Sequence, residues 1–204
     1  MRIDIVTLFP AMFEAVFGES IIKRAREKGL LDIRLTQLRD FAFDKHRQVD
    51  DSPFGGGSGM VLKPEPMFRA VRSIVANSTA KRRRIVLLCP SGATFTQAKA
   101  KELAAEEQLI FLCGHYEGLD ERFVEREVDL EVTVGDCVLT GGEIPAMAIV
   151  DAMSRLVPGV VGRGEAVAED IGSAIRGNTI DIAFDTTEEA IQFGRKTIEI
   201  FIMD

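Results

Sequence analysis

Residues 50–60 of this 204-residue chain read DDSPFGGGSGM, with four glycines among the five residues 55–59. A tight turn needs only one or two glycines, so this density indicates close approach of the backbone to a ligand, or a large motion. Long connections of this kind are commonly binding loops. We therefore expect a lid over a binding site here, and a flexible linker is the alternative.

Two further loops carry groups that could hold a heteroaromatic ligand. Residues 113–122 (CGHYEGLDER) contain the only tyrosine of the chain, Tyr116, with glycines on both sides and Glu117 next to it. Residues 134–143 (VGDCVLTGGE) end in a glycine pair that would bring backbone N–H and C=O groups to a ligand before a helix begins. His115 carries little weight, because a single histidine is more often an ordinary hydrogen-bonded residue than a catalyst.

The sequence lacks the motifs of several common kinds of site. No GxGxxG follows the first apolar run, and no Lys-Ser/Thr pair follows the glycines of residues 55–59, which argues against Rossmann-type and P-loop nucleotide sites. The two histidines are far apart and lack zinc-ligand spacing. No GxSxG is present, so a serine esterase site has no anchor.

The elements that must position these loops alternate along the chain. Apolar runs at residues 2–8, 31–35, 85–88, 109–112 and 130–134 predict strands. Segments of helical period lie between and after them, including one that Ser20 could cap and others near residues 67–75, 96–106 and 143–156. Such alternation predicts an α/β fold with a parallel sheet and helices on both faces.

The three cysteines indicate where the loops meet. Cys89, Cys113 and Cys137 are spaced 24 residues apart, each at or just past the end of a predicted strand. Because parallel strands end at the same edge of a sheet, the loops after them should form one shared crevice, where ligands of open α/β sheets bind. The thiols themselves we interpret as small buried apolar groups.

Charge and composition suggest a cytoplasmic protein without a membrane segment. The chain has 25 basic and 32 acidic residues, a net charge of −7, which taken whole argues against RNA as a partner. However, residues 1–101 hold 18 basic and 10 acidic residues, so a basic half is averaged with an acidic one. The run Lys81-Arg82-Arg83-Arg84 in the basic half is a candidate for phosphate contact, with a solvated loop as the alternative.

Five segments together resemble one known family. TLFPAMF, RDFAFDKHRQVDDSPFGGGSGM, CGHYEGLDER, VGDCVLTGGEIPAM and DAMSRLVPGV are similar, in order and spacing, to the bacterial tRNA (guanine-37-N1)-methyltransferases, the TrmD family. The resemblance covers residues 1 to about 170. It implies the SPOUT fold with a trefoil knot toward the C-terminal side, S-adenosyl-L-methionine as methyl donor, tRNA as substrate, and a homodimer with active sites between subunits.

The resemblance also implies roles for particular residues. Those of the cofactor site would be Leu88, Cys89, Pro90, Gly114, Tyr116, Glu117, Gly118, Val134, Gly135, Asp136, Cys137, Val138, Leu139, Gly141 and Gly142. Those accepting the guanosine would be Asp50, Phe54, Gly55, Gly56, Gly57 and Gly59. The family also uses magnesium, which Glu117 would help to bind, but the sequence itself shows no metal site.

Guanine N1 is protonated at neutral pH and must lose its proton before it can accept a methyl group. By resemblance, Asp170 would act as the base and Arg155 would support the developing charge on O6. A solvated linker acid and a surface helix charge are the respective alternatives.

The resemblance suggests a division of the chain at 1–160, a linker at 161–176 and a divergent segment at 177–204. Residues after Asp170 depart from the family pattern, where a helical tRNA-binding domain is expected. The alternative function is therefore a truncated cofactor-binding relative with little or no methylation activity. Ribose methylation is disfavoured, because that reaction needs no base for N1.

Overall fold

The computed structural model describes residues 1–161, with the exception of residues 54 and 57. The predictions that concern Phe54, Gly57, Asp170 and the segments 162–176 and 177–204 fall outside these residues. Within residues 1–161 apart from positions 54 and 57, no helix is both long enough and apolar enough to cross a membrane.

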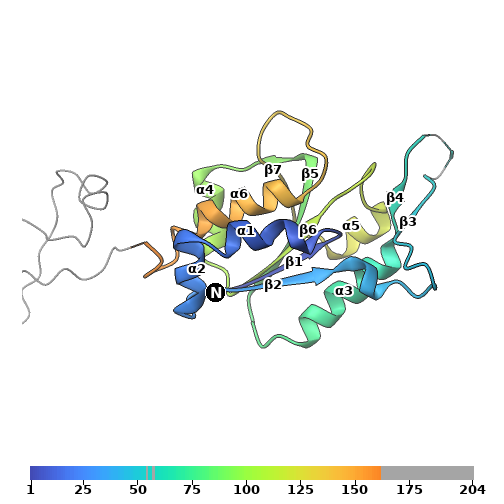
Figure 1. The fold of residues 1–204 in the computed structure, drawn as a ribbon. Coiled ribbons are helices and arrows are strands. Elements are labelled where there is room, and N and C mark those ends of the chain that lie inside the picture. Colours follow the sequence, from blue (N-terminus) through green and yellow to red (C-terminus); the bar gives the residue numbers. More distant parts are fainter. Residues whose placement is uncertain (54, 57, 162–204) are drawn as a thin grey trace, which may run out of the picture. The chain divides into compact units, whose positions relative to one another are not determined.

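Five main strands and their helices alternate along the described chain, as the sequence predicted (Figure 1). The elements are β1 (Arg2–Thr7), η1 (Pro10–Phe13), α1 (Glu14–Phe17), α2 (Ser20–Glu27), β2 (Asp32–Gln37), η2 (Leu38–Phe41), β3 (Asp50–Asp51), β4 (Val61–Leu62), α3 (Pro64–Ala76), β5 (Arg83–Thr94), α4 (Gln97–Ala104), β6 (Gln108–Cys113), α5 (Glu121–Glu127), β7 (Leu130–Thr133) and α6 (Glu143–Ser154). One detail differs: Glu19, rather than Ser20, is the capping residue of α2, and its side chain makes no capping hydrogen bond.

The main sheet has the strand order β2-β1-β6-β5-β7, and all of its pairs are parallel. The prediction of an α/β fold with a parallel sheet is therefore confirmed. The strands all end at one edge, which we call the carboxyl edge. Strand β5 is irregular between Leu88 and Ala93, so its residues there leave the ladder and extend over this edge. The trefoil knot stays a prediction.

Period-two alternation divides the strands between two cores. Leu109 and Phe111 of β6 belong to the core that α1, α2, α4 and α6 cover. Ile110 and Leu112, which point the other way, belong to the core under η2, α3 and α5. Figure 1 shows α4, α6 and α1 on one side of the sheet and α3 on the other. Because both of its faces are covered, the central strand β6 is buried along its whole length and is almost entirely apolar, whereas the edge strand β2 alternates with charged and polar residues.

Strand β1 interrupts its apolar run with Asp4, which is only 1% exposed. The side chain of Arg2 donates to its carboxylate at 2.8 Å, and the Gln108 side-chain amide donates at 2.7 Å. A buried charge of this kind is tolerated only when it is paired and hydrogen-bonded.

The basic run at residues 81–84 lies at the amino end of β5, which is the edge opposite the strand ends. Arg84 pairs with Glu102 and Glu106 of the α4 segment, and Arg82 lies 3.5 Å from Glu107. These acids compete with any phosphate for the same cations. The structure therefore favours the alternative of a local surface role for Arg82 and Arg84.

The glycine-rich segment leaves and rejoins the fold through a short antiparallel ladder. Asp50 of β3 pairs with Leu62 of β4, and Asp51 pairs with Val61. This two-stranded ladder brings the two ends of the segment together at the carboxyl edge (Figure 1).

Candidate functional site

A pocket of about 360 Å³ opens at the carboxyl edge, between the ends of β5, β6 and β7. This size is in the range of small-molecule sites. The three loops marked by the cysteines line it together, so the crevice predicted from their spacing is confirmed. The residues around it are Leu87–Ser91, Gly114–Leu119, Glu121, Val124, Glu131–Val134, Cys137–Gly142 and Pro145.

Three backbones converge at glycines in this pocket. The N–H of Gly142 donates to the carbonyl of Gly114 at 2.9 Å. A Cβ on Gly142 would stand 2.6 Å from the Cα of Cys113, and one on Gly114 would stand 2.9 Å from the carbonyl oxygen of Leu88. Real Cβ atoms do not approach so closely, so only glycine lets the start of α6, the end of β6 and Leu88 of β5 meet here.

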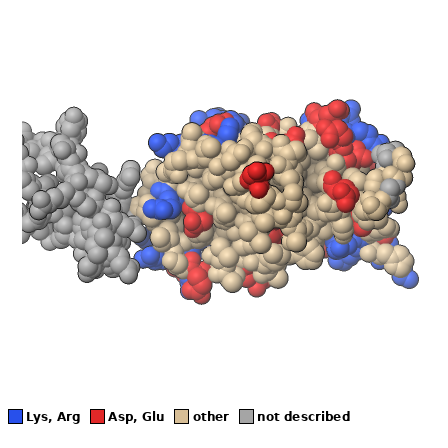
Figure 2. All heavy atoms as spheres, turned by 90° about the horizontal axis from the view of Figure 1, so that it is seen from above, with Lys and Arg blue, Asp and Glu red and all other residues tan. Residues whose placement is uncertain are grey.

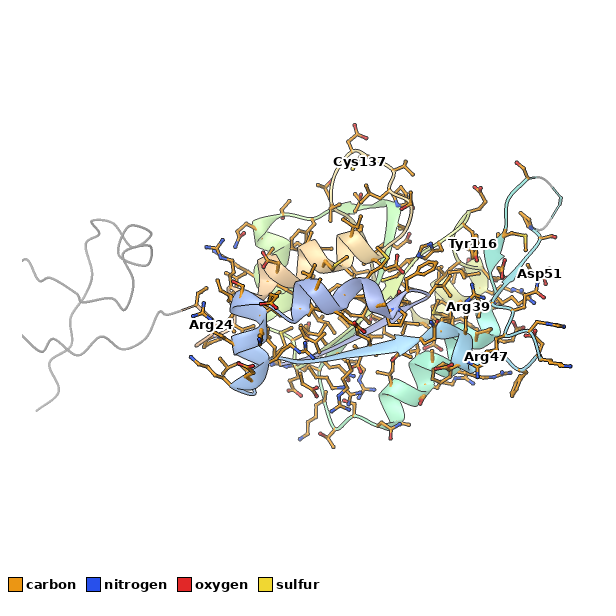
Figure 3. The ribbon with its side chains drawn as sticks, in the orientation of Figure 1. Arg24, Arg39, Arg47, Asp51, Tyr116 and Cys137 are labelled. Atoms are coloured by element: carbon orange, nitrogen blue, oxygen red, sulfur yellow. The ribbon has the colours of Figure 1, made fainter. Side chains whose placement is uncertain are left out.

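Tyr116 occupies a backbone conformation that few non-glycine residues adopt, with φ of 60°. Its side chain is 48% exposed and lies at the pocket edge (Figure 3). A residue in the left-handed region is held there by its surroundings, and such residues are frequent at binding sites.

The pocket loop is joined to the end of the glycine-rich segment by backbone hydrogen bonds. The N–H of Glu117 donates to the carbonyl of Met60 at 2.9 Å, and the N–H of Leu62 donates to the carbonyl of Gly118 at 2.9 Å. Gly59 packs so closely on Glu117 that a Cβ there would stand 2.6 Å from Cγ of that side chain. The segment expected to accept one ligand is therefore attached to the loop expected to hold another.

A buried carboxylate at the start of α6 contacts the loop that carries Tyr116. Glu143 is 2% exposed, and its Oε2 lies 2.7 Å from Nε2 of His115. Its Oε1 accepts from the hydroxyl of Thr7 at 2.6 Å. Burial alone raises the pKa of Glu143, but the hydrogen bonds from His115 and Thr7 outweigh it and leave the pKa below its ordinary value.

The pocket lining is acidic. It includes Glu117, Glu121 and Glu131, and among the residues that the structure describes no lysine or arginine lines it. The thiol of Cys89 donates to Oε2 of Glu131 at 3.1 Å. Burial, together with the nearby Glu131 carboxylate, raises the pKa of this thiol, so it is protonated at neutral pH and is a poor nucleophile. The pocket consequently favours a ligand with positive charge.

Most residues that the sequence assigned to a cofactor line the pocket, while Gly135 and Asp136 lie in the same loop but outside the lining. Of the guanosine-side residues, Asp50, Gly55, Gly56 and Gly59 lie in the ladder and the segment beside it. The interpretation of the cysteines as buried apolar groups fits Cys113 and is wrong for Cys137, which is exposed.

Arg155 is not brought to the pocket of its own chain. It is the C-cap of α6, whose N-cap, Gly142, lines the pocket. A helix of 12 residues spans about 18 Å, so Arg155 stands one helix length away from that residue.

Sequence reasoning missed several residues of the site. Glu131 lies within a short strand and looked like an ordinary exposed strand residue. Thr7 and Glu143 are 136 positions apart and gave no joint signal. The sequence contains one weak signal for them: Thr7 lies near the end of a predicted strand, and Glu143 is the first residue of a predicted helix.

Among the described residues, no group of three or more His, Cys, Asp and Glu side chains could hold a metal ion. Glu117, which the resemblance connects with magnesium, therefore has no partner set among residues 1–161 outside positions 54 and 57.

Fold and site together define a class: an α/β protein with an acidic small-ligand pocket at the carboxyl edge of a parallel sheet. The chain belongs to the tRNA (guanine-1)-methyltransferase TrmD family, whose model matches residues 1–180. The resemblance stated from five segments is thus confirmed.

Individual relatives agree. A tRNA (guanine-N(1)-)-methyltransferase of Pelotomaculum thermopropionicum is 54% identical over 170 residues, which are 83% of this chain and 68% of the relative. One from Geobacillus kaustophilus is 55% identical over 83% of this chain and 69% of its own. The crystal structure of the tRNA (m1G37) methyltransferase from Aquifex aeolicus superposes with a TM-score of 0.73 at 39% identity, covering 82% of this chain and 74% of that one.

Proposed function

We propose that this chain transfers a methyl group from S-adenosyl-L-methionine to N1 of guanosine 37 in tRNA, next to the anticodon. The observation that carries the proposal is a coincidence of position. The family match over residues 1–180 includes all three loops that form the pocket at the carboxyl edge.

The pocket suits this cofactor on chemical grounds. S-adenosyl-L-methionine carries a sulfonium and an ammonium group, and bound in the pocket it would supply an electrophilic methyl group. Glu117, Glu121 and Glu131 give the lining a negative potential that favours such a cation. The glycine backbones of the loops after β6 and β7 leave room for a ligand to approach N–H and C=O groups closely.

On the guanine side, two residues would do the chemistry. Asp170 would accept the proton of N1, and Arg155 would stabilise the negative charge that then develops on O6. The assignment of both rests on the family resemblance. The segment around Gly55, Gly56 and Gly59 would accept the target guanosine, and its hydrogen bonds to the Glu117 loop would keep the guanosine beside the methyl donor.

The position of Arg155 favours a homodimer with composite sites. Since this residue stands about 18 Å of helix away from its own pocket, a role at O6 would require the pocket of a second copy. An apolar surface for such a contact exists near the start of α6 and around η1 and α1. Its exposed members are Phe9, Met12, Val16, Val138, Leu139 and Ile144.

Figure 2 shows the face on the α6 and α1 side of the sheet, and it is mostly uncharged there, with the charged side chains concentrated toward its ends. Contiguous exposed apolar surface of this kind marks protein contacts.

If the sites are composite, mixing Arg155→Ala with a variant that cannot bind cofactor should restore activity that neither has alone. Failure of mixing to restore activity, with dimers present by sedimentation, would refute the shared site.

The proposal is tested with tRNA transcripts carrying guanosine or adenosine at position 37 and labelled cofactor. We expect 1-methylguanosine by nucleoside mass spectrometry with the first transcript alone. Equal labelling of both would refute N1 methylation of guanosine 37.

Asp170→Ala should abolish methyl transfer and leave the affinity for the cofactor nearly intact. Retained activity would show that another group is the base.

The second candidate is a cofactor-binding relative without turnover. Its basis is that residues after Asp170 depart from the family pattern. Calorimetry that finds cofactor binding, together with no methyl transfer to the guanosine transcript, would favour it.

A further inference from the structure

Phe43 is the most exposed large apolar side chain in the described part of the molecule, at 84%. It follows η2 and belongs neither to the two cores nor to the apolar cluster around η1 and α6. Isolated exposed apolar residues are common and need no function. This one differs, because other groups are arranged around it.

An arginine lies against the ring of Phe43. The guanidinium carbon of Arg69, from α3, stands 3.1 Å from the ring centroid. The same guanidinium donates to the backbone carbonyl of Phe41 at 3.2 Å, so it is anchored to the chain two residues before the ring. A cation–π contact therefore holds one face of the ring against α3, while the side chain as a whole stays 84% exposed.

The loop that carries Phe43 is fixed by its own hydrogen bonds. The carboxylate of Asp44 accepts from the backbone N–H of His46 at 3.0 Å and from that of Gln48 at 2.9 Å. Arg47 pairs with Asp40 at 3.0 Å. Phe43 is thus presented to solvent by an ordered turn.

The two elements that hold this ring carry further exposed cations. Lys45 is exposed two residues after Phe43, and Arg72 is exposed one turn beyond Arg69 on α3, with its guanidinium 5.3 Å from the ring of Phe68. We call Phe43, Arg69, Lys45 and Arg72 the Phe43 platform. An aromatic ring with cations around it is the arrangement by which proteins hold unpaired nucleotides, the ring for the base and the cations for phosphates.

The platform lies near the candidate site. It follows β2, whose carboxyl end is at the same sheet edge as the pocket, and β3 begins at Asp50, seven residues after Phe43. Figure 3 shows Arg39 and Arg47, from the same segment, at the end of the molecule that also carries Tyr116 and Asp51.

We propose that the Phe43 platform binds an unpaired nucleotide of the tRNA anticodon loop, close to the guanosine that is methylated. The base stacks on Phe43, and Lys45 and Arg72 contact flanking phosphates. This inference rests on the proposed function. A second copy of the chain is a poorer occupant, because a guanidinium stacks on the ring and the large apolar cluster suited to such a contact lies around η1 and α6.

The size of the expected effect follows from base stacking. Removing an aromatic partner of one base costs roughly 5- to 100-fold in affinity. Phe43→Ala should raise KM for tRNA by such a factor. The kcat at saturating tRNA and the affinity for the cofactor should stay unchanged, since the platform touches neither the pocket nor the reacting atoms.

The experiment uses the full chain and the guanosine-37 transcript with four proteins: wild type, Phe43→Ala, Phe43→Trp and Leu35→Ala. Leu35 is a control, since it is an exposed apolar residue on the edge strand β2. We expect KM to rise for Phe43→Ala alone, because tryptophan also stacks. An equal rise for Leu35→Ala, or a KM within twofold of wild type for Phe43→Ala, would overturn the proposal.

Two further measurements separate the possibilities. If Phe43→Ala shifts sedimentation toward a smaller species, the ring is a protein contact and the proposal is wrong. If the wild type does not methylate the transcript, the proposed function fails first. The platform is then judged by fluorescence anisotropy with a labelled anticodon stem-loop, where equal affinity of wild type and Phe43→Ala would overturn it.

Discussion

Gly142→Ala is expected to destabilise the protein and weaken cofactor binding through packing alone. Gly142 has φ of −80° and ψ of −6°, which any residue can adopt, so the substitution introduces no backbone strain. The added Cβ would stand 2.6 Å from the Cα of Cys113 and 2.9 Å from the N of Gly114. All of these are backbone atoms, so no side-chain rotation can relieve the contact.

The magnitude follows from what must move. Restoring ordinary contact requires a separation of about 1 Å, and this lengthens the 2.9 Å hydrogen bond from Gly142 N–H to the Gly114 carbonyl beyond a useful distance. Overpacking costs about 1–3 kcal/mol and a lost buried hydrogen bond about 1–3 kcal/mol. The loss of unfolded-state entropy on replacing glycine offsets about 0.4–1 kcal/mol. The net expectation is about 1–5 kcal/mol and centred near 3 kcal/mol, for which the Tm would fall by about 6–12 °C.

Gly135→Ala is the matched control, since Gly135 lies in the same loop and a Cβ there would meet nothing within 4 Å. It should stay within about 0.5 kcal/mol of wild type. Urea denaturation gives the free energies of unfolding, for which Gly135→Ala is the control, and calorimetry gives the cofactor affinity of Gly142→Ala, which should fall below that of the wild type. If Gly142→Ala unfolds like Gly135→Ala and binds cofactor as the wild type does, the close contact between the end of β6 and the start of α6 is refuted.

Three further predictions concern buried groups. Glu143→Gln should lower the free energy of unfolding at pH 7, and its difference from the wild type should shrink as the pH falls below 4.5. The reason is that a carboxylate whose pKa is lowered in the folded state stabilises the protein only while it is ionised. Urea denaturation at pH 7, 5 and 3 tests this, and a difference that stays constant contradicts it. Cys137 should be alkylated first and Cys113 last, since burial raises the pKa of the Cys113 thiol well above its ordinary value; peptide mass spectrometry reads the order, and early labelling of Cys113 would disagree. Arg2→Met should cost about 3 kcal/mol by leaving the buried charge of Asp4 without its cation, and a loss below 1 kcal/mol in urea denaturation would show that Gln108 alone suffices.

The arrangement of the main sheet could be predicted from sequence because it is encoded locally. Each strand is a short apolar run bounded by helical period, and the alternation of the two implies parallel strands. The equal spacing of Cys89, Cys113 and Cys137 then placed three loops at one edge without any knowledge of strand order. What the spacing could not give was the environment of each thiol, which ranges from buried Cys113 to exposed Cys137.

The support of the site could not be predicted, because it depends on residues distant in sequence. Nothing near His115 indicates that Glu143 will lie beneath it or that Thr7 will complete the hydrogen bonds. Those contacts exist because β1 and β6 are neighbours in the sheet and α6 begins beside their ends. Similarly, the basic run around Arg84 reads as a phosphate site until the fold places Glu102 and Glu106 beside it.

The net charge of −7 was a poor guide for the same reason. Its acidic residues serve separate purposes: some line the pocket, as Glu131 does, and some neutralise the cations at the amino edge, as Glu106 does for Arg84. Cations such as Lys45, in the segment between β2 and the glycine-rich segment, remain exposed. A pocket that favours a cationic ligand and a neighbouring surface that favours a polyanion can therefore coexist a short distance apart. The hydrogen bond from the N–H of Glu117 to the carbonyl of Met60 joins the pocket loop to the end of the glycine-rich segment. That end cannot move away from the pocket without breaking this bond.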